Sequence, residues 1–160
     1  MADHPKIVML DRYQTGESAN PSPEKILAGI PRTRVSNQFT DGSQQFFCGL
    51  WTSTAGKWRV RYTEYEFCVL IEGRVRLESI SGEKQEMRAG DAFVVPAGYE
   101  GIWEVAEPCK KWYAISRRSL KGRLPEQARS SGRSGRLSDR LGQRLDDPRD
   151  LPGFDDQRGR

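Results

Sequence analysis

The middle of the chain alternates short apolar segments with glycines. Between residues 73 and 98, glycine recurs every eight or nine residues. The segments between these glycines are rich in β-branched and aromatic residues, and their polarity alternates, as in Arg74-Val75-Arg76-Leu77-Glu78. Evenly spaced short strands with glycine turns are typical of a small antiparallel barrel or sandwich. We therefore expect an all-β fold.

The same alternation predicts strands on both sides of this region. Residues 7–10 fit a short strand, and residues 24–30 fit either one helical turn or a strand. No amphipathic helix of useful length is predicted between residues 45 and 116. The strands expected there span residues 45–51, 57–63, 67–71, 74–78, 84–88, 91–95, 101–105 and 111–115.

The composition changes after residue 116. Residues 117–160 carry 12 basic and 7 acidic residues, a net charge of +5, whereas residues 1–116 are close to neutral at −1. Residues 122–160 are mostly Arg, Gly, Ser, Asp and Pro, so they cannot bury enough apolar surface to offset the entropy of ordering. We expect residues 1–44 to form an N-terminal arm and first strands that pack on the barrel. Residues 45–118 should form the barrel core, and residues 119–160 a disordered tail.

The positive charge of the tail raises the question of a nucleic-acid partner. Its Arg-Gly and Arg-Ser pairs would fit an RNA-binding segment. However, acidic residues cluster at positions 146–156, and no stacking aromatic accompanies the arginines. We interpret the tail as a solvated extension and do not expect a nucleic-acid partner.

The cysteine content and the N-terminal residues bear on the cellular compartment in which we expect the protein. Three cysteines at wide spacings, Cys48, Cys68 and Cys109, fit reduced thiols rather than a disulfide framework or a zinc site. The apolar run at residues 7–10 is too short for a signal-peptide core or a membrane span. We expect a cytoplasmic protein without a membrane partner.

Two spacings resemble the motifs of the cupin superfamily. Gly90, Pro96 and Gly98 match the second cupin motif, and Glu66 and Gly73 match the end of the first. The resemblance implies a cupin-type double-stranded β-helix, a small jelly-roll barrel.

A longer set of residues, over about positions 46–115, is similar to the small single-domain group named after the cupin domain of (S)-ureidoglycine aminohydrolase. The matching segments are Trp51, Gly56-Lys57-Trp58, Glu64-Tyr65-Glu66-Phe67-Cys68, Ala89-Gly90-Asp91, Pro96-Ala97-Gly98, Gly101-Ile102-Trp103-Glu104-Val105, Glu107-Pro108 and Lys111-Trp112-Tyr113.

This resemblance implies a manganese site built from Glu, His, His and Gln, and the chain departs from that pattern. In one register the two histidine positions of the first motif hold Val60 and Tyr62; in the other they hold Arg59 and Arg61. The histidine position of the second motif holds Gly101. Only Glu66 is left as a ligand, and one carboxylate does not hold a catalytic divalent metal. We expect no metal and no cofactor.

The candidate site lies inside the barrel. Strand alternation puts Trp58, Tyr62, Glu64 and Glu66 on one face, and the resemblance turns that face, with Trp103, toward the interior. These five residues, Trp58, Tyr62, Glu64, Glu66 and Trp103, are the predicted ligand-binding residues. A carboxylate in such a lumen is suited to proton transfer or to binding an amine. The alternative is a structural Glu66 held by backbone amides or by Arg59 or Arg61.

Other residues receive structural interpretations. Lys110 and Lys111 are expected to be a solvated pair on an edge strand. Cys68 and Cys109 are expected to be small core residues. Trp51 and Trp112 fit either the core or an outer sheet face used in a homodimer, which is the expected oligomer.

The sequence leaves three functions open. The first is metal-independent binding of a small polar metabolite. The second is an enzyme, with either (S)-ureidoglycine aminohydrolase-like or metal-free acid/base activity, for which Glu66 and Tyr62 are the catalytic candidates. The third is a structural module with a solid barrel. Beyond Glu64 and Glu66, no pair with distinct acid and base roles is evident, so the sequence favours binding.

Overall fold

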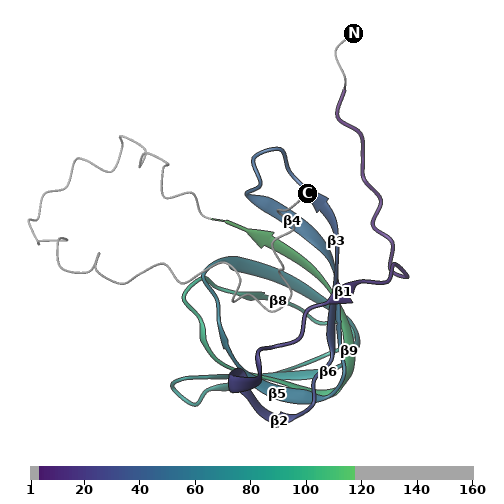
Figure 1. Cartoon of the computed structure of the whole chain (residues 1–160). Coiled ribbons are helices and arrows are strands. Elements are labelled where there is room, and N and C mark those ends of the chain that lie inside the picture. Colours follow the sequence, from purple (N-terminus) through teal and green to yellow (C-terminus); the bar gives the residue numbers. More distant parts are fainter. Residues whose placement is uncertain (1–3, 118–160) are drawn as a thin grey trace, which may run out of the picture.

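The computed structural model describes residues 4–117 of the 160-residue chain. It holds one 3-10 turn and nine strands within this range (Figure 1). In chain order they are β1 (Glu17–Ser18), η1 (Pro23–Lys25), β2 (Ile26–Gly29), β3 (Thr33–Thr40), β4 (Phe46–Ser53), β5 (Gly56–Arg61), β6 (Tyr65–Ser79), β7 (Lys84–Arg88), β8 (Ala92–Val95) and β9 (Glu100–Ser116).

Strand β9 is the centre of the sheet, and all of its pairings are antiparallel. Strand β6 follows β9 along nearly its whole length, from Tyr65 opposite Ser116 to Ser79 opposite Gly101. On the other side, β4 pairs with residues 109–116 of β9 and β5 pairs with residues 100–105. Strands β4 and β5 therefore continue one another along the same side of β9, separated only by residues 54–55.

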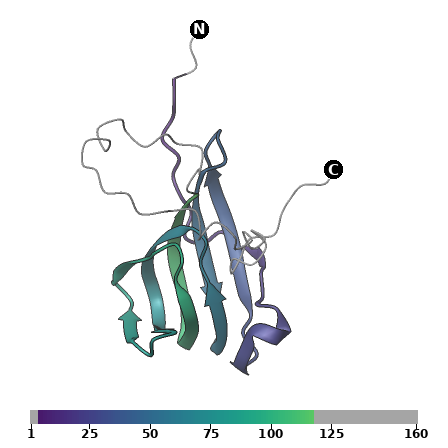
Figure 2. The same cartoon turned by 90° about the vertical axis from the view of Figure 1, so that its left-hand side faces the viewer.

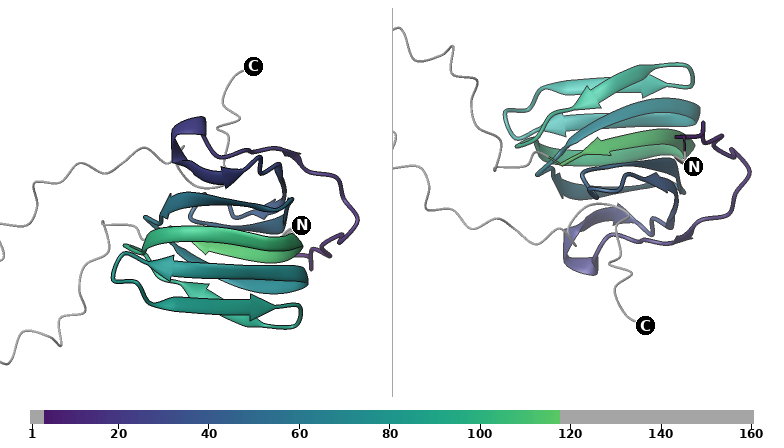
Figure 3. Two further views of the ribbon diagram at one scale, coloured as in Figure 1. Left: turned by 90° about the horizontal axis from the view of Figure 1, so that it is seen from below. Right: turned by 90° about the horizontal axis from the view of Figure 1, so that it is seen from above.

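The sheet curls over at the level of this break. The register between β6 and β9 shifts between Leu70 and Val75, and no residue of β6 is paired with residues 106, 108 or 109 of β9 in this stretch. Strands β9 and β6 run through both halves of the curled sheet. One half contains β1, β3, β4 and β8 with the adjoining parts of β9 and β6. The other half contains β2, β5 and β7 with the remaining parts of β9 and β6. Figure 1 shows the sheet bending around an interior, and Figures 2 and 3 show its strands side by side from other directions.

Aromatic side chains fill this interior. The ring of Trp51, from β4, lies 5.8 Å from that of Trp103 on β9 in an edge-to-face arrangement, and 6.3 Å from that of Trp58 on β5. Strand alternation puts these rings on the inner face, and each is at most 2% exposed. The two halves are therefore joined by packed aromatic rings as well as by backbone pairing.

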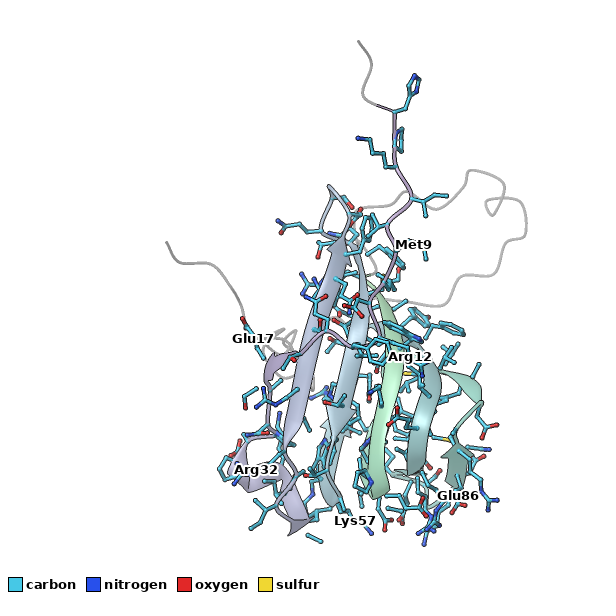
Figure 4. All side chains as sticks on the ribbon, turned by 90° about the vertical axis from the view of Figure 1, so that its right-hand side faces the viewer. Met9, Arg12, Glu17, Arg32, Lys57 and Glu86 are labelled. Carbon is cyan, nitrogen blue, oxygen red and sulfur yellow. The ribbon has the colours of Figure 1, made fainter. Side chains whose placement is uncertain are left out.

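The outer face divides into a charged part and an apolar part. Ion pairs cross β6, β7 and β9 at one end, where the Arg76 guanidinium lies 3.1 Å from Glu86 and 3.3 Å from Glu104; Glu86 is labelled in Figure 4. Toward the other end, the side chains of Phe67 and Val94 are 48% and 57% exposed. The structure describes a single chain, so the homodimer expected from the sequence stays a prediction.

The N-terminal arm crosses this outer face. Figure 4 shows its path past the labelled Met9 and Arg12 toward Glu17 at β1. The backbone N–H of Asp11 donates to the Gln38 side chain at 2.6 Å, and the Gln38 amide donates back to the Asp11 carbonyl at 2.8 Å. Strand β1 then pairs with β3, so the arm is fixed to the edge of the sheet.

The all-β prediction is confirmed, and the differences concern boundaries. The two strands predicted at 67–71 and 74–78 are one long strand, β6, and those at 101–105 and 111–115 are one strand, β9. Residues 24–30 contain both alternatives, a 3-10 turn followed by β2. The strand predicted at residues 7–10 is wrong, because this segment has no sheet partner in the structure, and β3 was not predicted. The predicted tail at 119–160 lies outside the described residues.

Within residues 4–117, no helix has the length and hydropathy that a membrane crossing would require.

Gly73 gives a test of the point where the sheet curls. Its φ is +84°, and a Cβ there would overlap the Pro108 carbonyl oxygen and lie 2.8 Å from Cys109 Cβ. Gly82 has a similar φ of +87° with nothing within 4 Å of a Cβ. We expect Gly82→Ala to lower the free energy of unfolding by about 1 kcal/mol through backbone strain alone. We expect Gly73→Ala to cost about 1–3 kcal/mol more, because overlap adds to the same strain.

Urea denaturation of the two variants measures this difference. Equal losses of stability would mean that the backbone at Pro108 moves aside at little cost. The close approach of Gly73 to Pro108 would then not determine where the sheet curls.

Candidate functional site

The inner face of the first half is arranged in rows that cross β4, β9 and β6. Each row contains one residue from each strand, opposite one another in the pairing register. The three rows, in order along β9, are Trp51, Lys111 and Leu70; Gly49, Tyr113 and Cys68; and Phe47, Ile115 and Glu66.

Lys111 forms a buried ion pair with Glu66. Its ammonium Nζ lies 2.8 Å from Glu66 Oε1, and the two side chains are only 3% and 7% exposed. The two residues are two rows apart, so the lysine side chain extends along β6 and passes Cys68, whose Sγ is 3.3 Å from Nζ. A lysine is long enough to cover this distance, and both charges are thereby paired inside the barrel.

Two tryptophans enclose the same ammonium group. Nζ of Lys111 lies 5.0 Å from the ring centroid of Trp51 and 4.6 Å from that of Trp103. These distances are those of cation–π contacts, which are strongest in desolvated surroundings. Because Trp51 comes from one half of the sheet and Trp103 from the other, the ammonium group sits between the two halves.

The protonation states follow from these contacts. Burial lowers the pKa of Lys111, but the contacts with Cys68 and Glu66 outweigh burial and raise this pKa above its ordinary value. Burial raises the pKa of the Cys68 thiol to about 12, against the opposing effect of Lys111. At neutral pH the site therefore contains an ammonium group and a neutral thiol.

Several polar groups around this cluster have no partner. The indole nitrogens of Trp51, Trp58 and Trp103 and the Oε2 atom of Glu64 are buried without a hydrogen bond to any described residue. Burial and the Glu66 carboxylate raise the pKa of Tyr62 well above its usual value, so its hydroxyl stays protonated. A buried polar group without a partner is destabilising, so such a group in a native fold needs an explanation.

The five predicted ligand-binding residues are all buried, but they do not form one group. Glu66 and Trp103 contact Lys111 directly, and Tyr62 lies close enough to Glu66 to respond to its charge. Trp58 is opposite Trp103 in the register. Glu64 is different: its Oε1 accepts a hydrogen bond of 2.7 Å from Arg117, and burial raises its pKa although Arg117 opposes this effect.

The prediction for Lys111 is wrong. Strand β9 lies at the centre of the sheet, and Lys111 is 2% exposed rather than solvated at an edge. Its neighbour Lys110 points to the outer face, where Nζ lies 3.3 Å from Glu72. Lys111 and Tyr113 are two residues apart, so they lie on the same face of β9, and Tyr113 points inward. The Lys-x-Tyr pattern at 111–113 therefore indicated the burial of Lys111, and the prediction from the sequence missed it.

The arginine alternative for Glu66 is also corrected. Glu66 does belong to a buried ion pair, but its partner is Lys111. Arg61 binds Glu100 at 3.0 Å on the outside of the barrel, and Arg59 is exposed. The two arginines alternate with the inward Trp58, Val60 and Tyr62, so they face away from the interior.

The residues present do not fit the manganese ion that the resemblance implies. No group of three or more His, Cys, Asp or Glu side chains within residues 4–117 could hold a metal. The Glu66 carboxylate already binds Lys111. At Gly101, the second-motif histidine position, a Cβ would overlap the Glu78 carbonyl oxygen and lie 3.1 Å from Ser79 Cα, so the close approach of β6 requires glycine.

Comparison with known proteins agrees with this architecture. The model of the EutQ-like cupin domain matches residues 40–113. A protein of unknown function of the DUF861 family from Pseudomonas syringae pv. tomato is similar, with 28% identity and a TM-score of 0.62 over 67% of this chain and 46% of that one. The chain thus spans about half the length of that relative. The EutQ protein of Clostridium difficile shares 17% identity, with a TM-score of 0.51 over 61% of this chain and 79% of that one. No match was found among the curated proteins.

The buried pair can be tested by a double-mutant cycle. Glu66→Gln leaves an unpaired buried ammonium and Lys111→Met an unpaired buried carboxylate, so we expect each to lower the free energy of unfolding by about 3–5 kcal/mol. The double variant should lose far less than the sum, because no uncompensated charge remains. Lys110→Met, which removes a partly exposed pair, should cost about 1 kcal/mol or less. Additive losses in chemical denaturation would show that Glu66 and Lys111 are not coupled.

The cysteines report whether the interior is closed. Cys68 and Cys109 are 0% and 5% exposed, whereas Cys48 is partly exposed. Burial raises the pKa of both buried thiols to about 12. We expect iodoacetamide at pH 8 to modify Cys48 first in the native protein and all three thiols after denaturation, as followed by peptide mass spectrometry. Native Cys68 reacting as fast as Cys48 would mean that the barrel opens readily.

Proposed function

We propose that this chain, which carries a cupin domain at residues 40–113, binds a small polar metabolite inside its barrel without a metal ion. The observation that carries the proposal is the buried polar cluster around Lys111 and Glu66, with unpartnered donors on the surrounding aromatic rings. Ligand sites are commonly apolar cavities with a few convergent polar groups, and this interior has that composition.

The cost of the ion pair supports binding over a solid barrel. Burying two charges requires desolvation of both, and well-packed apolar residues of the same volume are often equally or more stabilising. A barrel that only packed its core would gain no stability from Lys111 and Glu66 over apolar residues of the same volume. A barrel that orients a polar ligand would gain a charged group and fixed hydrogen-bond donors.

The same geometry argues against acid/base catalysis. The carboxylate of Glu66 is held by Lys111, and the Tyr62 hydroxyl stays protonated because its pKa is raised. Lys111 is an ammonium group at neutral pH. General acid/base catalysis needs a group that exchanges protons near the working pH, and these three groups do not supply an acid and base pair. An activity like that of (S)-ureidoglycine aminohydrolase would further need the metal ligands that are missing here.

Co-purifying molecules test the proposal. Full-length protein purified by mild steps should release an enriched small molecule on denaturation, detected by liquid chromatography and mass spectrometry. The matched variants are Lys110→Met, which changes the outer face, and the double variant Glu66→Gln/Lys111→Met, which removes both interior charges. We expect the molecule with wild type and Lys110→Met and not with the double variant.

An identical profile from all three proteins would contradict an interior site. If no molecule is enriched, the unbound protein is titrated with a panel of small metabolites and the fluorescence of its tryptophans is followed. A panel that leaves the fluorescence of Trp51, Trp58 and Trp103 unchanged would favour the solid barrel.

A further inference from the structure

Apart from Glu64 Oε2, whose carboxylate partner atom Oε1 binds Arg117, the unpartnered buried groups of the interior can donate, and this points to the class of ligand. Trp51, Trp58 and Trp103 each bury an indole Nε1 that has no hydrogen-bond partner among the described residues. An indole N–H donates and cannot accept. The group that would satisfy these rings therefore has to be a hydrogen-bond acceptor.

The contacts of Lys111 also favour a ligand that accepts hydrogen bonds over a cationic ligand. The Glu66 carboxylate and the faces of Trp51 and Trp103 are the groups that would otherwise bind a cationic ligand. All three are already in contact with the protein's own cation, Lys111, at 2.8, 5.0 and 4.6 Å respectively. A second cation would therefore find these groups occupied, whereas a hydrogen-bond acceptor would find unpartnered indole N–H groups beside the Lys111 ammonium.

We infer that the interior site binds a small carboxylate, which accepts hydrogen bonds from the indole N–H groups of Trp51 and Trp103 beside the Lys111 ammonium. This inference rests on the proposed function and names its ligand class. It replaces the amine ligand suggested by the sequence, because that suggestion treated Glu66 as an unpaired anion. The ligand has to be small, since both rings are at most 2% exposed.

The indole N–H signals of the full-length protein in proton–nitrogen correlation spectra test the inference directly. The chain has four tryptophans, and Trp112 faces away from the interior, so its signal is an internal control. The probes are straight-chain mono- and dicarboxylates of two to five carbons, each compared with the amide and the primary amine of the same length. Single Trp→Phe variants assign the four signals.

We expect the carboxylates to shift the signals of Trp51 and Trp103 in a saturable way and to leave Trp112 unchanged. The matched amides should bind about tenfold more weakly, because they lack the charge-assisted hydrogen bond. The amines should not shift the interior signals. Glu66→Gln/Lys111→Met should bind the carboxylates at least about tenfold more weakly, and Lys110→Met should bind them as wild type does.

Three results would overturn the inference. Interior shifts with amines but not with carboxylates would reverse the ligand class and leave the proposed function standing. Equal carboxylate affinity in wild type and the double variant would remove Lys111 from recognition. No interior shift with any probe would also reject the carboxylate, and the proposed function would fall with it only if the co-purification experiment were negative as well.

Discussion

The ion pair between Lys111 and Glu66 is the constraint on which the arrangement of the interior depends. Both groups are buried, so each is stable only while the other is in place. They come from the two longest strands, β9 and β6, and a shift of one residue in either strand would turn a charge outward and leave its partner unpaired. The pair therefore specifies the register of the strands that organise the rest of the sheet.

An internal cation also changes what the interior of this barrel is suited to bind. The carboxylate at Glu66 is retained where the resemblance places a metal ligand, but the positive charge opposite it belongs to a lysine attached to the fold. Such a cation cannot dissociate and offers no open coordination position. A ligand held in this interior would be recognised through electrostatics and hydrogen-bond direction, and the aromatic rings of both halves would set its shape.

Much of the fold could be predicted from the sequence, because alternation and glycine spacing are local signals. They identified the strands that contain Trp58, Cys68 and Trp103, and the family resemblance supplied the inward direction of Trp58, Glu66 and Trp103. The pairing of distant strands is not a local signal, and this is why Lys111 was misplaced: its burial depends on β4 and β6 flanking β9. Strand β3 was missed because its residues, with Ser36 and Asn37 between Val35 and Phe39, alternate weakly.

The position of β9 in the chain has a consequence for biosynthesis. The strand that holds β4, β5 and β6 together is the last of the barrel to be made, so β4 and β5 each lack the neighbour on one side until residue 116 has left the ribosome. Its partners lie tens of residues earlier in the sequence, and such non-local pairing is slow because loop closure precedes the gain in contacts. Until then the emerging chain exposes tryptophans and unpaired strand edges, which are the features that chaperones bind.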